Sequence, residues 1–195
     1  MELRKKRIER KTAETSIVAD LVLDGRGRVS VRTGIGMLDH LLSTLSYHAR
    51  FDLELECRGD LHVDDHHTAE DCALVLGRAI DGALGDRTGI ARFGSAYAPL
   101  DEALCRCVVD LGGRPWAEVE LGLAGPCLGG LAAQNATHFF TTLAMQSRMC
   151  LHLDVLRGAN DHHRAEAASK ALALALRQAA SITGGGLPST KGVLG

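Results

Sequence analysis

DHHTAED at residues 65–71 and DHHRAEA at residues 161–167 are two copies of one motif, in which two adjacent histidines precede a glutamate. The chain has nine histidines, and these copies contain four of them. Upstream of the motifs, HLLSTL at 40–45 corresponds to HFFTTL at 138–143, and an alanine-rich apolar segment follows each motif. Three matched elements in the same order indicate an internal duplication.

The composition is that of a globular protein: 195 residues, 46% of them hydrophobic, with a formal net charge of −2. No apolar run is long enough to span a membrane, and the basic segment 1–11 leads into no signal core, so we expect a cytoplasmic protein. We interpret that basic run as a solvated surface segment rather than a nucleic-acid-binding arm. The six cysteines form no Cys-x-x-Cys pair, which favours reduced thiols over a thiolate zinc site.

Strand patterns open each half of the chain. Residues 15–34 contain an Asp24-Gly25 turn signal, and residues 102–121 contain Gly112-Gly113. Both segments are predicted hairpins. Residues 51–64 alternate apolar and polar side chains and predict a further hairpin, with 148–156 in the equivalent place of the second half.

Helical spacing follows both motifs, because apolar residues recur there every three or four positions. The residues before the paired histidines are natural N-caps, and shorter helices are predicted after His40 and His138. Each half therefore reads as strand pair, helix, strand pair, helix. The predicted fold class is α+β, with sheets packed on a central helix layer. The half-repeats are 1–88 and 89–195, within one domain, and their boundary falls in 85–94.

The spacing of the motif suits two metal ligands on one helix face. Positions i and i+4 share a face, so His66 and Glu70 can hold one ion, and the second copy offers the same pair. The neighbouring His67 is turned about 100° away and suits a second ion. With the upstream histidines, the set forms two sites of three histidines and one glutamate: His40, His66, His67, Glu70, His138, His162, His163 and Glu166. Ligands without sulfur favour Mn(II), with Fe(II) or Zn(II) as alternatives.

Six segments carry a wider similarity: RKTAET (10–15), GIGMLDHLL (34–42), GDLHVDDHHTAED (59–71), THFF (137–140), NDHHRAEAASKALALALRQA (160–179) and LPSTKGVL (187–194). In this order, and over nearly the whole chain, they resemble the imidazoleglycerol-phosphate dehydratase family. The resemblance implies a hydro-lyase of histidine biosynthesis that converts imidazole glycerol phosphate to imidazole acetol phosphate. It also implies a duplicated α+β half-domain and a homo-oligomer of 24 subunits with sites at subunit interfaces.

For the site, the resemblance implies two Mn(II) ions, one held by His40, His67, His162 and Glu166 and the other by His66, Glu70, His138 and His163. Both ring nitrogens of the substrate would bind manganese, and the imidazolate would expel the neighbouring hydroxyl. Glu14 matches the family's catalytic glutamate, although a glutamate at the start of a strand is otherwise an ordinary surface residue.

Phosphate contacts are also implied by the resemblance, at Arg92, Arg114, Lys170, Ser189, Thr190 and Lys191. The tail segment GGGLPSTKG is glycine-rich but lacks the P-loop spacing. Lys170 lies one turn beyond Glu166 and therefore on the same helix side. The sequence departs from the family at Gly36-Met37, where proline and phenylalanine are frequent, and at Thr137, where an acidic residue is common.

Two other functions fit some of these observations. A dimetal hydrolase would use a metal-bound hydroxide, but such sites usually bridge their ions with carboxylates, whereas this set is dominated by histidine. A metal-storing scaffold with a nucleic-acid-binding N-terminus leaves Glu14 and the PSTK ending unexplained. We therefore expect a small-molecule phosphate substrate, and neither nucleic acid nor membrane as a partner.

Overall fold

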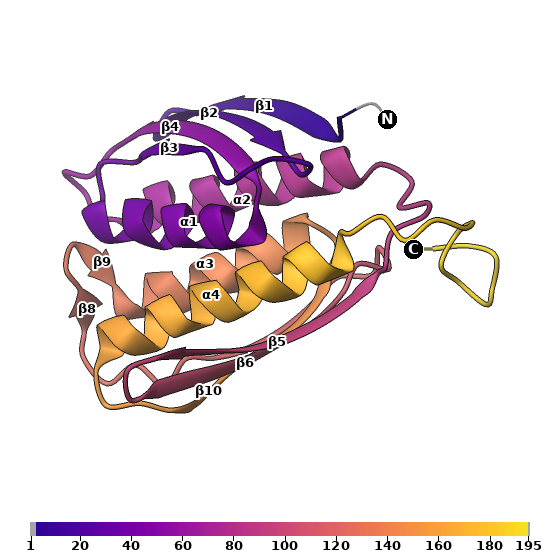
Figure 1. Cartoon of the computed structure of the whole chain (residues 1–195). Coiled ribbons are helices and arrows are strands. Elements are labelled where there is room, and N and C mark those ends of the chain that lie inside the picture. Colours follow the sequence, from indigo (N-terminus) through magenta and orange to yellow (C-terminus); the bar gives the residue numbers. More distant parts are fainter. Residues whose placement is uncertain (1–2, 195) are drawn as a thin grey trace.

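Two four-stranded sheets enclose a layer of four helices in the computed structural model, which describes residues 3–194 (Figure 1). Met1 and Glu2 of the basic segment and the terminal Gly195 lie outside the described residues. The predicted α+β class, with sheets packed on central helices, is confirmed. Among residues 3–194, no helix combines the length and the apolar composition that crossing a bilayer requires.

The two halves share one order of elements. The first half contains β1 (Lys5–Lys11), β2 (Thr15–Val22), β3 (Val29–Arg32), α1 (Gly36–Ala49), β4 (Asp52–Gly59) and α2 (His66–Leu84). The second contains β5 (Phe93–Leu100), β6 (Ala103–Asp110), β7 (Trp116–Glu120), α3 (Ala133–Gln146), β10 (Cys150–Arg157) and α4 (Asp161–Ala179), with the short β8 (Cys127–Leu128) and β9 (Leu131–Ala132) before α3. Each half is thus three strands, a helix, a strand and a helix, and the predicted alternation of strand pairs was wrong.

The predicted hairpins at 15–34 and 102–121 do not form. The sheet orders are β1-β2-β4-β3 and β5-β6-β10-β7, so in each half a later strand separates the two that were expected to pair. β3 runs parallel to β4, and β7 runs parallel to β10. Parallel neighbours need a long crossover, which α1 and α3 supply, and this connection takes precedence over the local turn signals.

One further strand prediction needs correction. Residues 51–64 contain only the single strand β4, and the chain then turns directly into α2. The described part of the basic segment lies at the surface, as expected, and it also forms the strand β1, which pairs with β2 at the edge of the first sheet. Charged side chains are compatible with an edge strand because its outer face meets water.

The helices meet across the two halves. α1 packs against α4, and α2 packs against α3, while the alanine-rich side of α4 lies on β5 and β6. Small residues bring these layers together: a Cβ at Gly94 would lie 2.1 Å from the carbonyl oxygen of Ala175. This pairing of first-half with second-half helices places the upstream histidines beside the motifs.

Candidate metal centre and anion-binding cavity

Three predicted ligands converge between α1 and α4. Glu166 Oε2 lies 2.8 Å from His40 Nε2 and 3.1 Å from His162 Nε2. The two imidazole rings stack with their centroids 5.3 Å apart. One donor atom from each residue lies within 4.8 Å of the others, which is close enough for all three to bind one ion. We call this group the α1–α4 triad.

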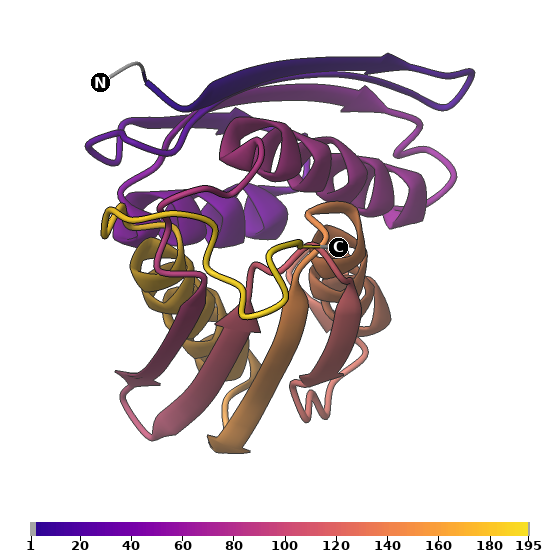
Figure 2. The same cartoon turned by 90° about the vertical axis from the view of Figure 1, so that its right-hand side faces the viewer.

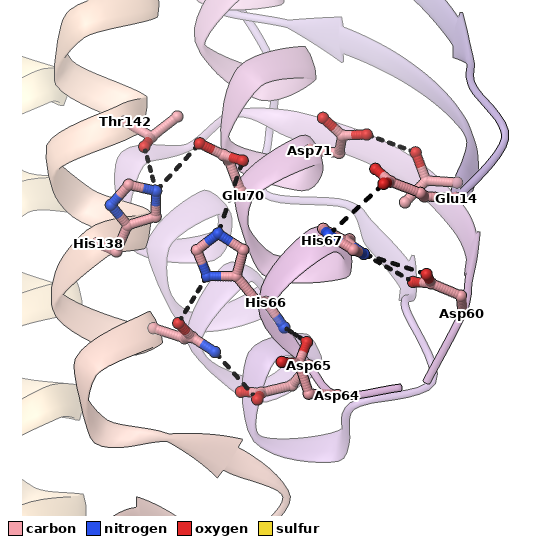
Figure 3. A network of polar contacts seen from close by, with 12 residues as sticks. Glu14, Asp60, Asp64, Asp65, His66, His67, Glu70, Asp71, His138 and Thr142 are labelled. Carbon is pink, nitrogen blue, oxygen red and sulfur yellow. Dashed lines mark hydrogen bonds and ion pairs between the residues drawn. The ribbon is translucent and has the colours of Figure 1, made fainter. Parts of the chain in front are cut away.

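A second triad lies between α2 and α3 (Figure 3). Glu70 carboxylate oxygens lie 3.1 Å from His138 Nε2 and 3.8 Å from His66 Nε2, and the two rings stack at 5.4 Å. The donor atoms again lie within 4.8 Å of one another. We call this group the α2–α3 triad. Each of the two triads therefore joins an i,i+4 pair from one half of the chain to an upstream histidine of the other half.

Capping contacts set the start of both motif helices. The Asn160 side-chain oxygen accepts hydrogen bonds from the backbone N–H groups of His162 and His163, at 2.9 and 3.3 Å. Asp64 Oδ1 accepts from the backbone N–H of His66 at 2.8 Å. Because the first helical residues are fixed in this way, the side chains that follow leave the helices in defined directions.

Asn135 is a site residue that sequence reasoning missed. Its side-chain oxygen lies 3.0 Å from His66 Nδ1, and its amide donates to Asp65 Oδ1 at 3.0 Å. A hydrogen bond at one ring nitrogen fixes the orientation of a histidine and leaves Nε2 for a metal ion. The sequence signal is weak, because Asn135 and His66 lie 69 positions apart.

The second histidine of each motif lies outside the triads of its own chain. His67 Nδ1 lies 3.1 Å from Asp60 Oδ2, and its Nε2 lies 3.6 Å from Glu14 Oε1. His163 Nδ1 lies 2.7 Å from Glu102 Oε2. The structure therefore brings Glu14 to a predicted ligand. It does not bring His67 or His163 to the ligand groups predicted for them.

The charged groups around the α1–α4 triad keep its carboxylate ionised, which is the form that binds a metal ion. Burial raises the pKa of Glu166, but hydrogen bonds from Lys170 and His40 outweigh that effect and hold the pKa at about 2. Lys170 Nζ lies 2.7 Å from Glu166 Oε1. The hydrogen bond with Asp60 raises the pKa of His67, and the hydrogen bond with Glu102 raises the pKa of His163. Metal binding at these two rings would therefore displace protons.

Five of the six predicted phosphate-binding residues line one cavity of about 140 Å³: Arg92, Arg114, Ser189, Thr190 and Lys191. Asp110 accepts two hydrogen bonds from Arg92, at 2.7 and 2.9 Å, and Pro188 O accepts a third at 2.8 Å. Arg92 therefore anchors the C-terminal segment, while its own charge is largely balanced by Asp110. Gly112 also lines the cavity, and a Cβ there would lie 2.9 Å from Arg92 Nη2.

This cavity lies far from the triads within one chain. Arg92 N donates to the carbonyl oxygen of Ala179, at the end of α4, whereas Glu166 lies in its first turns. The helical rise puts these positions about 20 Å apart. Figure 2 faces the end of the molecule that the C-terminal segment crosses, and α4 begins at the other end (Figure 1). Lys170, beside Glu166, belongs to the triad end and not to the cavity.

The departures from the family pattern leave the triads intact. Gly36 begins α1, and a Cβ there would meet open space. Thr137 lies beside His138, and its hydroxyl donates to the carbonyl oxygen of Ala133 at 3.4 Å. Neither residue replaces a ligand.

Comparisons with known proteins agree on one family. The family model described as imidazoleglycerol-phosphate dehydratase matches residues 33–176. The proteins of that name from Phytophthora nicotianae and Chlorobium luteolum are 58% and 52% identical to the chain, over 98% and 96% of its length. The chain spans 43% of the first relative and 94% of the second.

Solved structures give the same result. The imidazoleglycerol-phosphate dehydratase of Pyrococcus furiosus has a TM-score of 0.83 at 33% identity, covering 96% of this chain and 100% of that one. The Staphylococcus aureus enzyme has a TM-score of 0.80 at 29% identity, covering 91% and 99%. The chain therefore belongs to the imidazoleglycerol-phosphate dehydratase family, whose members are hydro-lyases of histidine biosynthesis.

Proposed function

We propose that this chain dehydrates imidazole glycerol phosphate with two Mn(II) ions bound at its two triads. The observation that carries the proposal is the convergence, twice, of two imidazoles and one carboxylate with donor atoms within 4.8 Å. Nitrogen and oxygen donors without sulfur suit Mn(II), and three protein ligands leave coordination positions for further groups. Each triad uses its own glutamate, which argues against a carboxylate-bridged hydrolase centre.

The proposal includes a site shared between copies of the chain. His67 would complete the α1–α4 triad of a neighbouring copy, and His163 would complete the α2–α3 triad of a neighbouring copy, since neither histidine joins a triad of its own chain. The separation of about 20 Å between the triads and the cavity of one chain also supports a site shared between copies. Only three carbon atoms and one oxygen atom separate the ring of the substrate from its phosphorus atom. A homo-oligomer would bring the triads of one copy close to the anion-binding cavity of another copy. The family resemblance suggests 24 subunits.

In this mechanism the ions would supply Lewis-acid stabilisation to the imidazole ring of the substrate. The chain's residues do the remaining work. Glu14, near His67, accepts the proton lost by the carbon next to the one that loses its hydroxyl, and the enol then becomes a ketone. Lys191 and Arg114 hold the phosphate through charge-assisted hydrogen bonds. Glu14 then gives this proton to the released hydroxyl group, so that the two lost groups leave as one water molecule and the glutamate is ionised again.

A product assay tests the function. Purified chain with Mn(II) and imidazole glycerol phosphate is expected to form a ketone without releasing inorganic phosphate. A dimetal hydrolase would release phosphate, and a metal-storing scaffold would bind manganese without turnover. Either of these results would contradict the proposal.

Removal of the metal is expected to loosen the assembly as well as stop turnover. If one ion has ligands from two copies, its binding energy is also assembly energy. Size-exclusion chromatography with and without EDTA measures this, and adding Mn(II) back should restore the larger particle. A particle of unchanged size without metal would show that the ions are not needed to hold it together.

Lys191→Met is expected to weaken substrate binding. Loss of one charge-assisted contact costs roughly 1.5–3 kcal/mol, which is a rise in KM of roughly 10- to 100-fold. Metal content should stay the same, because Lys191 lies at the cavity end. Lys191→Arg should keep most of the affinity, and Lys5→Met, on the exposed edge strand, is the matched control. An unchanged KM in Lys191→Met would remove this residue from the phosphate site.

A further inference from the structure

One buried carboxylate connects the turn that carries Glu14 to the helix that carries His66 and Glu70. Asp71 follows Glu70 in α2, and its side chain is only 6% exposed. Its Oδ2 accepts a hydrogen bond from the Thr15 hydroxyl at 2.5 Å, and its Oδ1 accepts from Arg10 Nε at 2.9 Å. Figure 3 shows Asp71 beside the Glu14 turn, on the side of α2 away from His138.

The turn itself is held as one unit. The Thr12 hydroxyl oxygen accepts from the backbone N–H groups of Glu14 and Thr15, at 3.1 and 2.9 Å, and Thr12 N donates to the carbonyl oxygen of Thr15 at 2.9 Å. Because these bonds join the turn residues, fixing the Thr15 hydroxyl to Asp71 fixes the backbone of Glu14 relative to α2.

The duplicated half forms its helix and its triad without a carboxylate at this position. Ala167 stands where Asp71 would stand, yet Glu166 still lies 2.8 Å from His40. In that half, the carboxylate of Glu102 in the β5–β6 turn accepts from the backbone N–H groups of Ala159 and Asn160. In the second half, the carboxylate in the turn itself thus anchors that turn to the residues that precede α4.

The first turn is arranged differently. Asp60 orients His67, and Asp71 anchors the turn. The Glu14 carboxylate therefore has neither of the two tasks that Glu102 has in the second half. A buried carboxylate is costly unless it is fully partnered, and its presence in only one half suggests a function specific to that half.

We propose that Asp71 is a positioning residue that sets the Glu14 carboxylate in place for proton transfer. The inference rests on the proposed role of Glu14. A proton-transferring group must be held to within a fraction of an ångström, and a displacement of about 1 Å can lower a rate roughly 10²-fold. Asp71 supplies this restraint through Thr15 without itself touching the substrate.

A double-mutant cycle tests the proposal in the full chain with manganese bound. Asp71→Asn is expected to lower kcat roughly 10- to 100-fold, with KM and manganese content unchanged. In a Glu14→Gln background the same change is expected to have almost no further effect, because there is no carboxylate left to position. Equal factors in both backgrounds, or loss of manganese in Asp71→Asn, would overturn the positioning role.

The two proposals fail in different ways. An unchanged kcat in Glu14→Gln alone would reject the proton-transfer role and the positioning role with it. A large loss in Glu14→Gln, combined with an equal Asp71→Asn factor in both backgrounds, would reject positioning alone.

Variants at Thr15 keep the test valid if Asp71→Asn folds poorly. Thr15→Val has nearly the same shape without the hydroxyl and should reproduce the loss of kcat, whereas Thr15→Ser should restore it. Asp20→Asn is the matched control, because it removes an exposed ion pair with Arg7 on the same two strands. Equal kcat values for Thr15→Val and Thr15→Ser would contradict the proposal.

Discussion

Replacing Glu14 with glutamine is expected to lower kcat by roughly 10²–10⁴-fold, the usual size of a lost general acid or base. Glutamine keeps the shape of the side chain but cannot take up the proton. Glu14 belongs to neither triad, and its side chain is 51% exposed, so the fold and both metal sites should be retained. Steady-state kinetics combined with metal analysis makes the measurement.

Glu9→Gln is the matched control, since Glu9 is an exposed glutamate on β1 that pairs with Arg7. It should leave kcat unchanged. A small loss in Glu14→Gln with normal metal content would mean that water or a metal-bound hydroxide moves the proton. A large loss accompanied by loss of metal would show that Glu14 supports the site structurally.

Replacing His162 or His66 with alanine is expected to remove about one of two manganese ions per chain, because each change breaks only one triad. Activity should fall by more than the roughly 10- to 100-fold that is typical for losing a residue that only hydrogen-bonds to a metal ligand. Metal analysis of the purified variants decides it. His152→Ala, an exposed histidine on β10, should keep both ions. Two ions retained in both triad variants would contradict these metal sites.

The sequence predicted the i,i+4 pairs well because the helical period alone places His66 with Glu70 and His162 with Glu166. The helical period could not show that each triad joins the two halves, since that depends on how α1 packs on α4 and α2 on α3. That grouping was expected only from the family resemblance. Asn135, Asp60 and Glu102 were missed for the same reason: they meet histidines only in the folded chain. Asp71 did carry a signal, because the duplicate has alanine in its place.

The failed hairpin predictions at 15–34 and 102–121 have one physical cause. Asp24-Gly25 does mark a turn, but β3 continues through α1 into β4 and pairs with it, not with β2. Gly25 instead allows close approach to β4, since a Cβ there would lie 2.4 Å from the backbone nitrogen of Asp52. Local turn residues report where the chain bends, whereas the partner of a strand is chosen by long-range packing. The basic β1 has no clear apolar alternation and was therefore not predicted as a strand.

Subunit mixing tests most directly whether the active site combines residues of different copies. Glu14→Gln and Lys191→Met chains would be co-expressed with different tags, and particles containing both would be purified. If Glu14 and Lys191 of one site come from different chains, about one quarter of the sites in a random 1:1 particle have both intact. We predict activity at low substrate concentration well above the mean of the two parent variants. Activity equal to that mean would show that Glu14 and Lys191 of each site come from the same chain, which would contradict this account of the shared site.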